Sequence, residues 1–314
     1  MDSLREQIAS FLGFSPLSVA SDVQVLSSIE VDGFRRKLVQ YATADGEKIQ
    51  AFLFVPDGPV RGAVLALHQH NSQWEIGKSE VAGLVGDPLQ AFGPPLARQG
   101  IMVLAPDSVG FESRMKTASG GKGLAPKLEK PYSTAAGWLQ YYNQMAHRLV
   151  VGDLLMRKVL QDCGDALSVL QACSNSSQMG VIGHSFGGIS ALFLAALDTR
   201  VAYACTSGAV CSLREKLTNG TGLEMSLVIP GFLQRFDMDD VLRCVAPRRI
   251  FVVSSENDPQ TADAGEVVTK ARPAFQERHC EHHLTHLRVP GPHALDRQRA
   301  EAIMEWMVAE AVHP

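Results

Sequence analysis

The sequence predicts an α/β fold with a mostly parallel central sheet, helices on both faces and an antiparallel hairpin on the N-terminal side. From residue 63 onward, short apolar runs alternate with longer helix-like segments, which is the pattern of a parallel sheet covered by helices. Of the 314 residues, 46% are hydrophobic, enough to bury a large core. We see no internal repeat and no linker, so we expect one domain over residues 1–314.

Residues 1–32 are predicted to form an N-terminal helical extension. Apolar side chains recur at helical spacing over residues 2–13. Residues 14–32 contain only a few apolar anchors, and we expect them to connect this helix to the sheet.

The sheet is expected to begin with a hairpin. Residues 35–41 and 49–55 alternate apolar and polar side chains, and the Asp45-Gly46 pair between them is a strong turn signal. The expected parallel strands are residues 63–67, 101–105, 179–182, 201–205, 249–253 and 286–289. A long helix is predicted over about residues 134–173, and a closing helix over about 295–312. Residues 108–150 and 212–238 follow strand ends on one edge and are candidate lids.

The most informative motif is Gly183-His184-Ser185-Phe186-Gly187, a G-x-S-x-G pentapeptide between an apolar strand and an Ala-rich helix. This strand, turn and helix context is that of a nucleophile elbow, which exposes a serine hydroxyl at the edge of the sheet. The serine is expected at positive φ. A Cβ at either outer glycine would collide with the neighbouring strand or helix.

A serine hydroxyl needs a histidine to take its proton and a carboxylate to orient that histidine. In this architecture the order along the chain is serine, acid, histidine. Asp258 follows the strand 249–253 in a turn fixed by a proline, and we choose it as the acid, with Glu256 as the alternative. His293 lies in the rigid Pro-Gly-Pro loop after the last strand and is the expected base.

Two backbone N–H groups are expected to bind the oxyanion. Phe186 supplies one at the N-terminus of the helix after the elbow, and His70 supplies the other from the loop after the first parallel strand. His68 is expected to be a structural histidine that bonds the loop backbone.

From about residue 35 to 312 the chain resembles the α/β-hydrolase superfamily, and within it the dienelactone-hydrolase and acetyl-xylan-esterase-like branch. His68-Gln69-His70-Asn71 stands at the H-G-x-x oxyanion loop of that branch, with Gln69 in place of the usual glycine. Residues 105–114 resemble its D-x-x-G-x-G-x-S turn, and the stretches 229–231 and 246–249 resemble the approach to its acid-bearing strand. The resemblance implies the same triad, Ser185, Asp258 and His293.

Several aromatic side chains fall in segments expected to overhang Ser185, and they are candidate substrate-binding residues: Trp74, Phe111, Trp138, Tyr142 and Phe232, with Tyr141 beside them. Ordinary packing of these rings onto the sheet is the open alternative. Glu112 and Arg114 are expected to form an ion pair at the edge of the sheet.

Other function classes are not favoured. The net charge of −4 suggests neither nucleic acid nor an anionic membrane as a partner, and no apolar run is long enough to span a bilayer. The histidine-rich stretch 279–286 is interpreted as a solvated turn, so no metal and no cofactor are expected. The six scattered cysteines and the absence of a signal-like N-terminus favour a cytoplasmic protein.

The sequence therefore predicts a serine esterase that acts on a small-molecule carboxylic ester, with lactones and thioesters as further candidates. An acyltransferase or another tailoring enzyme of a biosynthetic pathway would use the same triad and remains an alternative. A peptidase and a binding protein without catalysis rank lower. A homodimer is one option for the oligomeric state.

Overall fold

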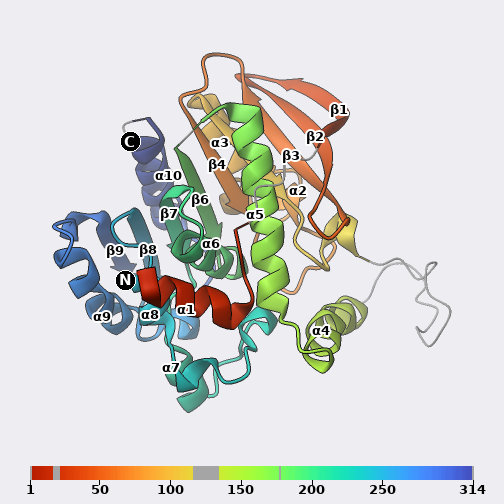
Figure 1. The fold of residues 1–314 in the computed structure, drawn as a ribbon. Coiled ribbons are helices and arrows are strands. Elements are labelled where there is room, and N and C mark those ends of the chain that lie inside the picture. Colours follow the sequence, from red (N-terminus) through yellow and green to blue (C-terminus); the bar gives the residue numbers. More distant parts are fainter. Residues whose placement is uncertain (1, 17–21, 116–133, 177, 313–314) are drawn as a thin grey trace.

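The computed structural model describes residues 2–16, 22–115, 134–176 and 178–312. Within them, nine strands form one sheet in the order β1-β2-β3-β5-β4-β6-β7-β8-β9 (Figure 1). The strands are β1 Gln24–Val31, β2 Phe34–Ala42, β3 Lys48–Pro56, β4 Gly62–Leu67, β5 Ile101–Pro106, β6 Met179–His184, β7 Val201–Ser207, β8 Arg249–Ser255 and β9 Leu284–Val289. The helices are α1 Asp2–Leu12, α2 Lys78–Val81, α3 Gly93–Arg98, α4 Thr134–Val150, α5 Leu155–Ser174, α6 Phe186–Leu197, α7 Leu213–Thr218, α8 Met238–Arg243, α9 Ala264–Gln276 and α10 Arg297–Val312.

The predicted sheet is confirmed. Strands β5, β4, β6, β7, β8 and β9 run parallel, and the hairpin of β2 and β3 joins them through an antiparallel pair between β3 and β5. Every residue of β4, β5 and β6 is buried, because helices cover both faces of these strands. Their carboxyl ends lie on one edge, where the elbow follows β6.

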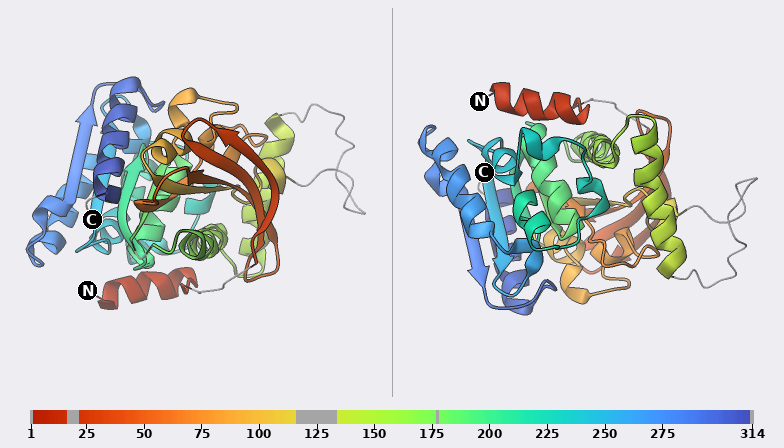
Figure 2. Two further views of the ribbon diagram at one scale, coloured as in Figure 1. Left: turned by 90° about the horizontal axis from the view of Figure 1, so that it is seen from above. Right: turned by 90° about the horizontal axis from the view of Figure 1, so that it is seen from below.

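Helices α1, α5, α6 and α8 lie on one side of the sheet, and α3 and α10 lie on the other (Figure 2). Helix α6 is buried along its whole length, because β6 and β7 contact it on one side and α1, α5 and α8 on the other. In both views of Figure 2, α1 (red) is the outermost helix on its side. No helix of the described residues is long and apolar enough to cross a membrane.

The expectation of a connecting segment over residues 14–32 is wrong for its second half. Residues 24–31 form β1, an edge strand that pairs with β2 through a two-residue turn at Asp32-Gly33, with Gly33 at φ +86°. Seven of its eight residues are exposed, so no buried apolar pattern marks it. The Asp-Gly pair was a signal that could have predicted this hairpin, as Asp45-Gly46 does for the next one.

The single helix expected over residues 134–173 is two helices, α4 and α5. Gly152 adopts φ +77° between them, and the Asp153 N–H bonds the Arg148 carbonyl across the turn. A left-handed glycine ends a helix at little cost. Helix α4 can therefore leave the direction of α5, and Figure 1 shows it at the margin of the molecule.

Candidate active site

Ser185 lies in the sharp turn between β6 and α6, with φ +55° and ψ −122°. Its N–H bonds the Ser207 carbonyl on the neighbouring strand β7 at 2.8 Å. A Cβ at Gly183 would lie 2.2 Å from the backbone of Gly187, and one at Gly187 would lie 2.2 Å from the Leu67 carbonyl oxygen. The two glycines thus allow the close approach of β4, β6 and α6 on which the strained serine depends.

Replacement of Gly187 by alanine should destabilise the protein by about 3 kcal/mol or more, because backbone atoms surround the new methyl group and cannot move independently. Gly265→Ala is the matched control, since a Cβ at this helical position meets nothing within 4 Å. It should raise the free energy of unfolding by about 0.5 kcal/mol. Urea denaturation measures both, and equal stabilities for the two variants would contradict this picture of the turn.

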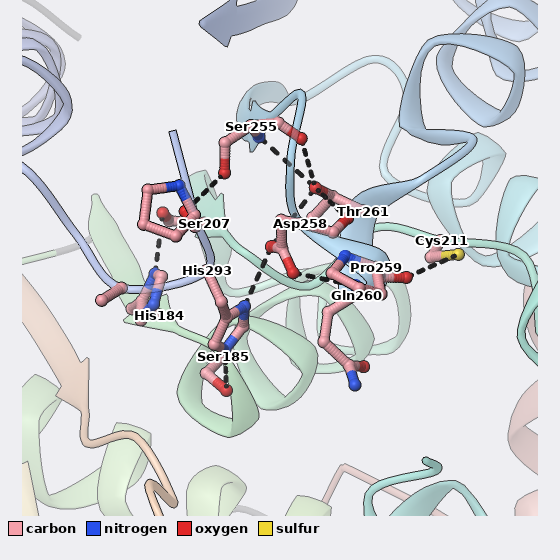
Figure 3. A network of polar contacts seen from close by, with 12 residues as sticks. His184, Ser185, Ser207, Cys211, Ser255, Asp258, Pro259, Gln260, Thr261 and His293 are labelled. Carbon is pink, nitrogen blue, oxygen red and sulfur yellow. Dashed lines mark hydrogen bonds and ion pairs between the residues drawn. The ribbon is translucent and has the colours of Figure 1, made fainter. Parts of the chain in front are cut away.

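The structure brings Ser185, His293 and Asp258 together (Figure 3). His293 Nε2 lies 2.9 Å from Ser185 Oγ, and His293 Nδ1 lies 2.9 Å from Asp258 Oδ2. His293 comes from the loop between β9 and α10, and Asp258 from the turn after β8. The loops after the carboxyl ends of β6, β8 and β9 therefore converge on one continuous hydrogen-bonded chain.

Asp258 is held as a buried carboxylate. Its side chain is 0% exposed, and Oδ1 accepts the Gln260 N–H at 2.8 Å while Oδ2 also accepts the Thr261 hydroxyl at 3.3 Å. Burial opposes ionisation, but the hydrogen bond and charge of His293 and the bonds from Gln260 and Thr261 outweigh it and hold the pKa of Asp258 below its ordinary value. The alternative acid, Glu256, is exposed, and its recorded bond is made by its backbone N–H to Val289.

His184 is a second histidine beside the relay, and the sequence did not single it out for this role. Its ring is fully buried, 5.0 Å from the ring of His293, and its Nδ1 lies 3.0 Å from Ser207 Oγ. Burial, reinforced by the positive charges of His293 and Arg299, lowers the pKa of His184 to about 3. The ring of His184 is therefore uncharged at neutral pH, and the imidazole of His293 lies beside it. A Cβ at Gly208 would approach both rings, at 2.6 Å and 3.2 Å.

The proposed oxyanion donors are the backbone N–H groups of Phe186 and His70. The Phe186 N–H opens α6, and no acceptor among the described residues is recorded for the His70 N–H. The ring of His70 is fixed because its Nδ1 accepts the Ser72 N–H at 3.0 Å. Burial, with a smaller contribution from His68, lowers the pKa of His70 to about 4. The ring is thus neutral near neutral pH and presents an N–H at Nε2.

His68 bonds backbone, as expected. Its Nε2 accepts the Ser108 N–H at 3.0 Å, so its Nδ1 carries the proton that is donated to the Gln69 carbonyl at 2.8 Å. Gln69 turns its side chain into the protein and donates to Glu80 at 3.0 Å. The amide thereby occupies a buried polar site rather than the space above Ser185.

An aromatic cluster surrounds His70. The ring of His70 lies 5.1 Å from Trp74, 5.4 Å from Phe111 and 5.3 Å from Tyr141. Phe111 also stacks on Phe186 at 5.9 Å. Two predicted substrate-binding residues, Trp74 and Phe111, therefore lie in this cluster, and both are buried against the ring of His70.

The other three candidates have their recorded ring contacts outside this cluster. Phe232 is 1% exposed and packs against Phe11 of α1 and Phe193 of α6, and its role in substrate binding stays a prediction. Trp138 and Tyr142 are exposed on α4 and stack on each other at 5.2 Å. Of the candidate lid 108–150, residues 116–133 lie outside the described residues.

The expected ion pair between Glu112 and Arg114 is wrong. Glu112 pairs with the buried Lys78 at 2.5 Å, and Arg114 pairs with Asp162 of α5 at 2.7 Å and with Glu47. Alternate residues in a 3-10 turn point in different directions, so partners distant in sequence satisfy each charge.

In the histidine-rich stretch, His283 Nδ1 lies 2.6 Å from the Pro247 carbonyl oxygen and His286 Nε2 lies 2.8 Å from Ser254 Oγ. These two imidazoles therefore contact different partners and do not share one.

No family model matches the chain. A curated relative, "Putative hydrolase YtaP" of Bacillus subtilis (strain 168), is 27% identical over 258 residues, which are 78% of this chain and 77% of the relative. Among solved structures, a "putative acetyl xylan esterase" from Bacteroides fragilis is similar with a TM-score of 0.73 at 15% identity, over 98% of this chain and 86% of that chain. A glucuronoyl esterase from Solibacter usitatus is similar with a TM-score of 0.64 at 15% identity, over 99% and 92%. The resemblance predicted from the motifs is confirmed for the fold, and the chain has the α/β-hydrolase fold.

Proposed function

We propose that the protein is a serine hydrolase that cleaves a carboxylic ester through an acyl-enzyme on Ser185. The observation that carries this proposal is the unbroken relay from Ser185 Oγ through His293 to Asp258, with both hydrogen bonds at 2.9 Å. A serine at positive φ that is hydrogen-bonded to a histidine, which is in turn hydrogen-bonded to a buried carboxylate, is the arrangement that activates a serine nucleophile.

In the proposed reaction, His293 Nε2 takes the proton of Ser185 as Oγ attacks the ester carbonyl. Asp258 keeps the proton of the imidazole on Nδ1 and stabilises the imidazolium that forms. The N–H groups of Phe186 and His70 bind the oxyanion of the tetrahedral intermediate. His293 then gives its proton to the leaving alcohol as the intermediate collapses to the acyl-enzyme. Water attacks the acyl-enzyme with His293 again as the base, and His293 returns this proton to Ser185 Oγ as the bond to the acyl group breaks and the carboxylic acid leaves.

Hydrolysis is favoured over acyl transfer by the exposure of the base. The side chain of His293 is 35% exposed, so water can reach the group that activates it. A transferase needs an acyl-enzyme protected from water. The esterases of similar fold support an ester substrate, and two of them are an acetyl xylan esterase and a glucuronoyl esterase by name. Acetylated sugars are therefore the substrate class that we put first.

A panel of esters tests the proposal. It should hold p-nitrophenyl esters of increasing acyl length, an acetylated xyloside, a lactone and a thioester, each assayed with the protein and with Ser185→Ala. We expect hydrolysis of at least the short activated esters, and the largest kcat/KM on an acetylated sugar. Equal rates with both proteins would contradict the proposal, and an acyl product trapped by added alcohol in place of water would indicate a transferase.

A further inference from the structure

Arg299 is the largest charged side chain of the core, and it lies beneath the loop that carries His293. It belongs to the first turn of α10 and is 0% exposed. Nη2 donates to the Pro292 carbonyl at 3.0 Å and to the Ala294 carbonyl, and Nη1 donates to Ser255 Oγ at 3.0 Å. Nε donates to Asp296 at 2.8 Å. One guanidinium thus donates hydrogen bonds to the carbonyl of the residue before His293 and to the carbonyl of the residue after it.

A second link holds the same loop from the sheet. Ser255, the last residue of β8, donates its hydroxyl to the Pro292 carbonyl at 2.8 Å. The loop has no regular structure, Gly291 adopts φ +136°, and Pro292 has no N–H to donate. Arg299 binds this loop through two of its carbonyl oxygens, with the donors of one nitrogen of its planar guanidinium.

A buried guanidinium is costly unless it is paired, and its one carboxylate partner, Asp296, is 40% exposed. An ion pair of this kind could be made at the surface without that cost. The bonds that need the buried position are the one to Ser255 Oγ and the two to the carbonyls on either side of His293.

We propose that Arg299 is a positioning residue that sets the place of the His293 imidazole relative to Ser185. The proposal rests on the proposed function of the triad. A displacement of about 1 Å of a catalytic group can cost about 10²-fold in rate. Removal of the guanidinium should therefore lower kcat by about that factor and leave KM nearly unchanged, because Arg299 does not touch the substrate.

A double-mutant cycle on a p-nitrophenyl ester tests this role. Arg299→Met is measured in the wild-type chain and in a His293→Ala background. If Arg299 acts through His293, kcat falls in the first and does not fall further in the second, where the group that it positions is gone. Arg248→Met is the matched control, because Arg248 also bridges backbone carbonyls, those of Asp198, Val201 and Cys244, away from the triad. It should leave kcat unchanged.

An unchanged kcat for Arg299→Met, or the same fractional loss with and without His293, would overturn the proposal. Should Arg299→Met fail to fold, Ser255→Ala removes one of the two links to the Pro292 carbonyl without removing a charge, and it should show the same dependence on His293 with a smaller loss. An unchanged kcat for Ser255→Ala, or an equal fractional loss of kcat with and without His293, would likewise overturn the proposal. A wild-type chain without esterase activity would instead contradict the proposed function, so the two failures are distinguishable.

Discussion

Replacement of Ser185 by alanine should lower kcat on a p-nitrophenyl ester by about 10⁴- to 10⁶-fold. The hydroxyl is the atom that forms the acyl-enzyme, and no other described side chain is hydrogen-bonded to His293 Nε2 in a way that could replace it. The residual rate would come from the oxyanion donors and from substrate binding alone. The loss is measured as the ratio of the steady-state kcat values of the wild type and the variant at saturating ester.

The fold should survive this change, because the hydroxyl of Ser185 bonds only the His293 ring among the described residues. Ser190→Ala is a control on α6, the helix that follows Ser185. Its hydroxyl donates to the Phe186 carbonyl within α6, away from His293. A Ser185→Ala protein that turns over ester within tenfold of the wild-type rate would show that the relay is not the catalytic centre.

Replacement of Asp258 by asparagine should lower kcat by about 10⁴-fold. The amide can present its NH2 group to His293 Nδ1, which favours the tautomer with the proton on Nε2. In this tautomer Nε2 cannot accept the proton of Ser185. The substitution also removes the charge that stabilises the imidazolium. Because the pKa of Asp258 lies below its ordinary value, the wild-type carboxylate is ionised at neutral pH, so the variant lacks a charge that the wild-type enzyme carries there.

Glu256→Gln is the matched control for this change, two residues away in the same turn. Glu256 is exposed, and its side chain makes no recorded bond to His293 among the described residues. Its kcat should equal that of the wild type. If Glu256→Gln lost activity and Asp258→Asn kept it, the assignment of the acid would have to be exchanged between the two.

The sequence predicted those parts of the site that local rules determine. The elbow needs two glycines, a serine at positive φ, an apolar strand and an apolar helix, and all of these lie within about twenty consecutive residues. Asp258 and His293 follow from the strand ends that carry them. These rules involve chain order and turn chemistry, so no knowledge of the packing was required.

Features that depend on packing could not be predicted in this way. The burial of Phe232 depends on α1, which covers it from the other end of the chain, and the pairing of Arg114 depends on Asp162 of α5. Arg299 reads as an ordinary charged residue at the start of a helix, and only the fold places it under the His293 loop. Strand β1 was not predicted because its side chains are exposed, although Asp32-Gly33 marked the turn.

The most direct test of the central claim is mass spectrometry of the protein after reaction with a fluorophosphonate. The proposed relay predicts one phosphonyl adduct on the peptide that contains Ser185, and markedly slower labelling of His293→Ala, since the imidazole removes the proton of the attacking hydroxyl. An adduct on another residue, or no adduct on the folded wild-type chain, would contradict the assignment of Ser185 as the nucleophile.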